Sequence, residues 1–179
     1  KLDDRPHAHY GGWKTVWVIS HGSVRTLLEI IEHIFRFTKA DKNIGNIPLK
    51  QQDRAIRSYS STHFKALSML PGELDGEDLG PRLQSVLSAI GEVSRKYLMK
   101  KTTNQLEWYE TLSIERLDRK KLDQKAQRIL EELTKYGLLL DEGITFSRAD
   151  FGLCQRYDMN KIFTPAFRTT YRVRNHIYL

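Results

Sequence analysis

The sequence has little cysteine and no long apolar run. Its 179 residues include one cysteine, Cys154, which excludes an internal disulfide framework and is most simply a small buried side chain in a reducing compartment. No stretch approaches the roughly 20 apolar residues that cross a bilayer, and residues 1–6 lack the apolar run of a signal peptide. We therefore expect a cytoplasmic location and no membrane partner.

Motifs of common enzymes are missing as well. The six histidines are scattered along the chain, so they do not show the spacing of a metal site. There is neither a G-x-x-x-x-G-K-S/T phosphate-binding loop nor the G-x-S-x-G motif of α/β-hydrolases. We expect no catalytic residue, no metal ligand and no cofactor bound by this chain alone, and a stand-alone enzyme is disfavoured.

The charge of the chain is strongly positive. A formal net charge of +7 attracts polyanions, of which nucleic acid is the commonest, while an acidic membrane surface and an acidic protein are the alternatives. The hydrophobic share of 40% and the charged share of 28% are those of a folded protein. Because the chain starts at Lys1 rather than at a methionine, we expect a fragment whose upstream part is missing.

The first two thirds of the sequence predict a helical bundle. Residues 1–12 resemble a tail or linker, and the apolar segment 13–19 is expected to be a strand end. Apolar residues at helical spacing predict helices over 23–38, with Ser23 as N-cap, from Pro48 to before Pro71, and over 83–101; a short helix is expected over 104–112 and a loop over 72–80. The predicted bundle therefore covers residues 13–112.

The last third, residues 113–179, predicts a winged helix-turn-helix. A helix over 120–136 stops at Gly137, and Leu138 to Leu140 leads as a strand into the expected turn 141–143. Residues 144–146 and a segment around Tyr157 would supply the wing. The predicted fold class is mainly α, a helical bundle followed by a winged helix-turn-helix with a small β-hairpin.

Two groups of mostly cationic residues are candidates for DNA binding. The helix over 120–136 places Lys121, Gln124, Lys125, Arg128 and Lys135 in one sector that suits a major groove, although basic helix faces are often only solvated surface. Residues 170–179 alternate as a half-buried strand, and the stretch before His176 has no acidic residue, which leaves Lys161, Arg168, Arg172 and Arg174 uncompensated. Cations on an edge strand can equally serve to prevent edge-to-edge pairing.

Arg25 is a further candidate, and its neighbourhood resembles a known family. A guanidinium in the first turn of a helix can bind an anion held by another domain, and the alternative is an ion pair with Glu29 one turn away. The run Gly22-Ser23-Val24-Arg25-Thr26-Leu27-Leu28 resembles the sensor-2 segment, G-x-x-R opening a lid helix, of origin-recognition and initiator-type AAA+ ATPases. The segment from Arg156 to Phe167 resembles the closing segment of winged-helix domains in related bacterial P-loop ATPases of the STAND type.

This resemblance has implications for function. It implies that the bundle is a lid, that Arg25 contacts the γ-phosphate of ATP, and that a missing upstream domain holds ATP and magnesium. It also implies that the winged helix binds duplex DNA, with Arg148 and Arg156 near the minor groove, in a possible homo-oligomer. The leading alternative is a protein–protein interaction module without DNA binding. A free-standing transcriptional regulator is a third hypothesis, for which no effector pocket or dimer helix is evident.

Overall fold

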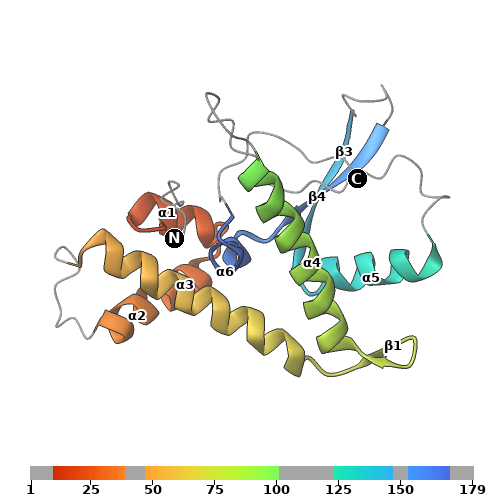
Figure 1. Ribbon diagram of the computed structural model, residues 1–179, viewed down its shortest axis with the longest axis horizontal. Helices are drawn as coiled ribbons and strands as arrows, with labels where there is room; N and C mark the ends of the chain where they lie inside the picture. The colour runs from red at the N-terminus through yellow and green to blue at the C-terminus, as the bar shows by residue number, and fades with distance from the viewer. Residues whose placement is uncertain (1–9, 39–46, 101–122, 147–152, 170–179) are drawn as a thin grey trace.

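The computed structural model describes residues 10–38, 47–100, 123–146 and 153–169. In this part of the chain, long helices dominate and two small antiparallel sheets complete the fold (Figure 1). This confirms the predicted fold class. The expected helix over 104–112 and the expected strand over 170–179 lie outside the described residues.

The first hydrophobic core lies between α1 (Trp13–Ile19), α2 (Val24–Thr38) and the first half of α3 (Leu49–Ala66). Helices 23–38 and 48–70 are close to their predicted bounds, but the expected strand end over 13–19 is wrong, because this segment is α1. Its buried side chains Thr15, Val16 and Ile19 follow helical spacing, which a seven-residue run is too short to distinguish from a strand. This core contains Tyr10, Val16, Ile19, Leu27, Ile30, Ile34, Ile47, Ala55, Ile56 and Tyr59.

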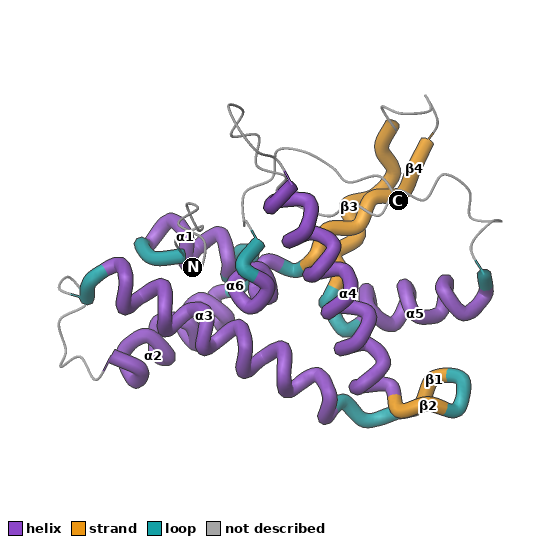
Figure 2. Tube along the Cα trace, in the orientation of Figure 1, coloured by secondary structure: helices purple, strands orange, loops and turns teal. Residues whose placement is uncertain are grey.

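The second core joins α4 (Leu79–Lys100), α5 (Gln124–Lys135) and the strands β3 (Leu139–Phe146) and β4 (Leu153–Met159). In Figure 2, α4 stands between the helices α1–α3 on one side and α5 with β3 and β4 on the other. The short helix η2 (Leu67–Met69) continues α3 into this core. The buried residues are Leu67, Leu79, Leu83, Leu87, Ile90, Leu130, Leu133, Leu138, Leu139, Tyr157, Met159 and Phe163.

Between α3 and α4 the chain forms a small hairpin rather than the expected loop over 72–80. Strand β1 (Glu73–Leu74) pairs with β2 (Glu77–Asp78) through a two-residue turn. Both turn residues have positive φ, 54° at Asp75 and 82° at Gly76. Asp-Gly is a favoured sequence for such a turn, since its twist matches that of the two strands.

The wing hairpin is also longer than expected. Strand β3 pairs with β4 along its whole length, and the register shifts between Asp141 and Gly143. The predicted turn over 141–143 is therefore wrong: these residues form a β-bulge within one strand. Gly143 has φ 83° and its N–H donates to Asp141 Oδ1 at 2.9 Å, so the Asp and Gly that suggested a turn instead stabilise the bulge.

The closing segment connects the two cores. It comprises η3 (Lys161–Phe163) and α6 (Thr164–Phe167), and Ile162 packs against both cores. Ser60 Oγ of α3 donates to the Ile162 carbonyl at 2.6 Å and accepts from Ala166 N at 3.0 Å. The bundle and the winged helix therefore share α3 and this segment, while the division into a 1–12 tail, a 13–112 bundle and a 113–179 domain stays a prediction.

Candidate functional site

Helix α5 presents an exposed polar face opposite its buried one. Leu130 and Leu133 point into the second core, and Arg128 lies about 140 to 160° around the axis from both, at 3.6 residues per turn. The exposed residues of this helix are Gln124, Lys125, Arg128, Glu131 and Lys135. Gln124, Lys125 and Arg128, which were predicted for DNA binding, therefore lie together on one accessible surface, with Lys135 beside them.

Two cations of this face are paired with carboxylates. Arg128 Nη1 lies 2.8 Å from Asp75 Oδ1 in the β1–β2 turn, and Lys135 Nζ lies 3.0 Å from Glu132 Oε1. The Arg128 side chain remains 60% exposed, whereas that of Asp75 is only 16% exposed. The acid is thus fixed in the protein surface while the guanidinium stays available to a partner.

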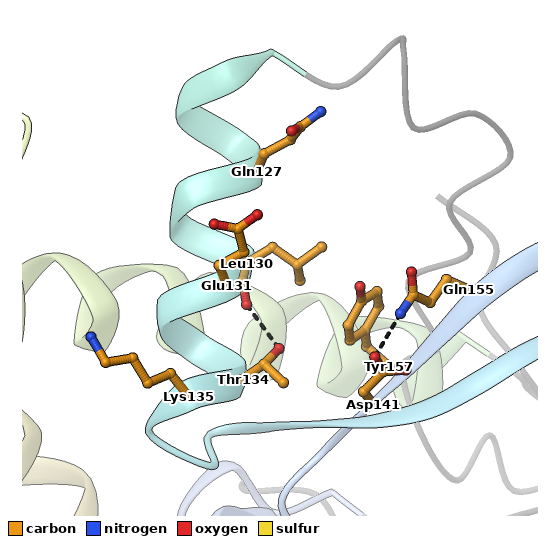
Figure 3. Close-up of a pocket in the computed structure, with 8 residues that line it drawn as sticks. All are labelled: Gln127, Leu130, Glu131, Thr134, Lys135, Asp141, Gln155 and Tyr157. Carbon is orange, nitrogen blue, oxygen red and sulfur yellow. Dashed lines mark hydrogen bonds between the residues drawn. The ribbon is translucent and has the colours of Figure 1, made fainter.

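A groove of about 390 Å³ separates α5 from the wing strands (Figure 3). It is lined by Gln127, Leu130, Glu131, Thr134, Lys135, Asp141, Gln155 and Tyr157. Gln155 Nε2 donates to Asp141 Oδ2 at 2.6 Å across the strands. Since Glu131 and Asp141 are both carboxylates, this groove disfavours phosphate, and phosphate contacts suit the outward face of α5 better.

Of the residues that line this groove, the sequence pointed only to Lys135 as a binding residue and missed the others. Gln127, Glu131 and Thr134 recur at helical spacing beside the apolar stripe, which is the signal for a second, polar face. Their proximity to Gln155 and Tyr157 depends on the register of β3 and β4, which the bulge sets.

The other predicted DNA-binding residues are distributed over separate elements. Arg156 on β4 is paired with Asp158, with 3.3 Å between Nε and Oδ1. Lys161 lies in η3, and Arg168 is exposed after α6 in a left-handed conformation with φ 56°. The remaining four lie outside the described residues: Lys121, Arg148, Arg172 and Arg174.

Arg25 stands at the exposed start of α2. Ser23 caps the helix as predicted, because its Oγ accepts from Thr26 N at 3.2 Å. The Arg25 side chain is 89% exposed, and its Nε donates to Glu29 Oε1 at 2.9 Å, which confirms the predicted ion pair. Glu29 Oε2 also accepts from Tyr59 Oη at 3.0 Å. The hydrogen bonds from Arg25 and Tyr59 hold the pKa of Glu29 below its usual range.

Two histidines that lie far apart in the sequence, His33 and His63, both contact the ring of Tyr59. The rings of His63 and His33 lie 4.2 and 5.5 Å from the ring of Tyr59, between α2 and α3. Burial lowers the pKa of both imidazoles. Within the described ranges, no group of three or more His, Cys, Asp or Glu side chains is placed to hold a metal ion.

The helical bundle, the exposed α5 and the β3–β4 hairpin together define a helical bundle fused to a winged helix. A family model described as ORC-CDC6-like matches residues 1–179, and the chain belongs to this family. The membership confirms the predicted relation to initiator-like AAA+ ATPases. Searches of curated proteins and of solved structures find no match to the chain. Among the residues that the structure describes, no helix combines the length and the apolar character needed to cross a membrane.

Proposed function

We propose that this chain is the non-catalytic C-terminal part of an initiator-like AAA+ ATPase and that its winged helix binds duplex DNA. The observation that carries the proposal is the outward face of α5, where Gln124, Lys125 and Arg128 are exposed together. An α-helix fits the major groove, and Arg, Lys and Gln are the side chains that most often bind phosphates and base edges there. The net charge of +7 favours the approach of a polyanion.

The bundle serves as the lid in this proposal. Arg25 is accessible at the start of α2, so its guanidinium can reach an anion that another domain holds. A single exposed guanidinium does not make a nucleotide site, and the sequence contains no phosphate-binding loop. In this proposal, ATP and magnesium are bound by an upstream domain of the full-length protein. We expect the isolated chain neither to bind ATP tightly nor to hydrolyse it.

The test is binding of the chain to labelled duplex DNA over a salt series. Each neutralised phosphate contributes a slope of about 0.9 in log affinity against log salt. In the wild-type chain we expect a slope that corresponds to several phosphate contacts. In the double variant Lys125→Gln/Arg128→Gln we expect a smaller slope and weaker binding. The control Lys14→Gln/Lys65→Gln removes the same charge from exposed positions on α1 and α3 and should change the affinity much less. Equal losses in the two variants would reduce the effect to net charge and contradict the proposal.

A protein-interaction module is the second candidate, and one observation favours it. The cations Arg128, Lys135 and Arg156 are already paired with acids, and the groove beside α5 contains carboxylates, so this surface has mixed charge. In that case the chain would not bind DNA even at low salt. Its self-association in sedimentation would instead survive salt, because apolar contacts are not screened.

A further inference from the structure

The acidic hairpin β1–β2 is built to hold one carboxylate in a fixed place. Leu74 packs against the second core, and Leu79 N donates to the Gly72 carbonyl at 2.9 Å to close the base of the hairpin. Arg82 of α4 bonds the Leu74 carbonyl at 3.3 Å and Glu77 at 3.1 Å. The hairpin therefore stands firmly on α4, and its turn residue Asp75 has a defined position.

That position is beside the centre of the exposed face of α5. Asp75 reaches Arg128, 53 residues later in the chain, and accepts from Nη1 at 2.8 Å. The β1–β2 hairpin and the β3–β4 strands appear on different sides of α5 (Figure 1). Arg128 points nearly opposite the buried Leu130 and Leu133, which is the direction of base edges when a helix lies in a major groove.

We propose that Asp75 is a positioning residue that orients Arg128 for recognition of a guanine edge. This inference rests on the proposed function. A guanidinium has five N–H donors in a planar fork, and a contact through Nη1 leaves donors for the O6 and N7 acceptors of guanine. An unrestrained arginine loses conformational freedom when it forms such a bidentate contact, whereas the hydrogen bond to Asp75 fixes the fork in advance.

The location of the pair favours orientation over simple competition with DNA. An acid that only blocked a phosphate contact would be expected on a flank of α5, where the DNA backbone passes. Asp75 instead contacts the residue at the centre of the face. Its carboxylate is mostly covered, and Arg128 stays more than half exposed, so the pair directs the guanidinium outward rather than burying it.

The experiment selects binding sites from a randomised duplex pool with the full chain, and then measures affinities for the selected site and for the same site with one guanine replaced. The variants are Arg128→Gln, Asp75→Asn and the matched control Asp78→Asn. Asp78 is an exposed acid of the same hairpin, so the control removes the same charge without breaking the ion pair between Asp75 and Arg128.

A bidentate arginine discriminates guanine from other bases by roughly 5- to 150-fold. We expect the wild-type chain and Asp78→Asn to show this discrimination at one position, and Arg128→Gln to lose it. In Asp75→Asn it should fall by about fivefold or more at the same position. The general affinity for DNA should rise equally in Asp75→Asn and Asp78→Asn, because each loses one negative charge.

Three results overturn the inference while DNA binding stands. These are a guanine preference that survives Arg128→Gln, equal discrimination in the two aspartate variants, and a higher affinity for every duplex in Asp75→Asn alone. The last result would make Asp75 a competitor for phosphate instead. Absence of DNA binding by the wild-type chain at low salt would overturn the proposed function itself, and the inference with it.

Discussion

Replacing Gly91 on α4 by alanine is predicted to destabilise the wild-type chain, but to stabilise a chain in which the side chain facing Gly91 has been shortened. An added Cβ atom at this position would lie 2.3 Å from Phe167 Cγ and 2.4 Å from Phe167 Cδ1, which is closer than non-bonded carbon atoms can approach. Phe167 cannot easily retreat, because its ring packs edge-on against Phe64 at 5.1 Å. Gly91 is therefore the position at which α6 packs against α4.

Two opposing effects set the magnitude for Gly91→Ala. Alanine inside a helix is favoured over glycine by about 1 kcal/mol. Overpacking of a filled contact costs about 1 to 3 kcal/mol. We expect Gly91→Ala to destabilise the wild-type chain by up to about 2 kcal/mol, and to stabilise a Phe167→Ala chain by up to about 1 kcal/mol.

The assay is urea unfolding of the wild-type chain, both single variants and the double variant. A coupling free energy of about 1 to 3 kcal/mol is expected between the two positions. Ser85→Ala, an exposed change on the same helix, reports helix propensity alone and should be indifferent to Phe167. Phe167→Val repeats the cycle in a background that retains more apolar area. If Gly91→Ala stabilises the wild-type chain and both Phe167 variants equally, Phe167 does not pack on α4, and the contact between α6 and Gly91 is refuted.

Two further predictions concern the bundle. The lowered pKa values of His33 and His63 mean that the unfolded chain binds protons more readily than the folded chain, so stability should fall as the pH drops below the ordinary histidine value of 6.5 and should level off below the folded pKa values. Unfolding midpoints between about pH 5 and 8 should show a weaker dependence in His63→Phe; a profile identical to that of the wild-type chain would exclude His63 as a source. Tyr10 is fully buried and its Oη donates to the carbonyls of Thr164 and Thr169, so Tyr10→Phe should lower the free energy of unfolding by about 1 to 2 kcal/mol. The control Tyr136→Phe at the surface should leave the free energy of unfolding unchanged. Equal effects of the two substitutions would count against the hydrogen bonds of Tyr10.

Periodicity predicted the long helices well, because each of them buries one stripe. Helix α2 buries Leu27, Ile30 and Ile34, and this spacing is visible in the sequence. The errors fall where the segments are short. Residues 13–19 have too few positions to separate the two periods. The sequence predicts a loop around Asp75-Gly76 and a turn at Asp141-Glu142-Gly143, where the chain forms a hairpin turn and a bulge.

The candidate site was partly predictable for the same reason. The exposed face of α5 and the Arg25–Glu29 pair depend on neighbours within one or two turns, so spacing was enough. The contact between Arg128 and Asp75 joins residues 53 apart in sequence, and the His33–Tyr59–His63 group joins two helices. Such contacts depend on how helices pack, which no local pattern specifies.

The shared helix α3 has a consequence for how the helical bundle and the winged helix can move together. Ala55, Ile56 and Tyr59 belong to the first core, while Phe64 packs against the second, so one continuous helix spans both. Tyr59 is bonded to Glu29, the partner of Arg25, and Ser60 on the next position holds the closing segment that follows β4. A packed helix transmits displacement rather than absorbing it. A change at Arg25 that moves α2 must therefore either shift α3 and the winged helix as well or break the hydrogen bonds at Tyr59 and Ser60. Loosening the contact between Phe167 and Gly91 should weaken the coupled movement of α3 and the winged helix.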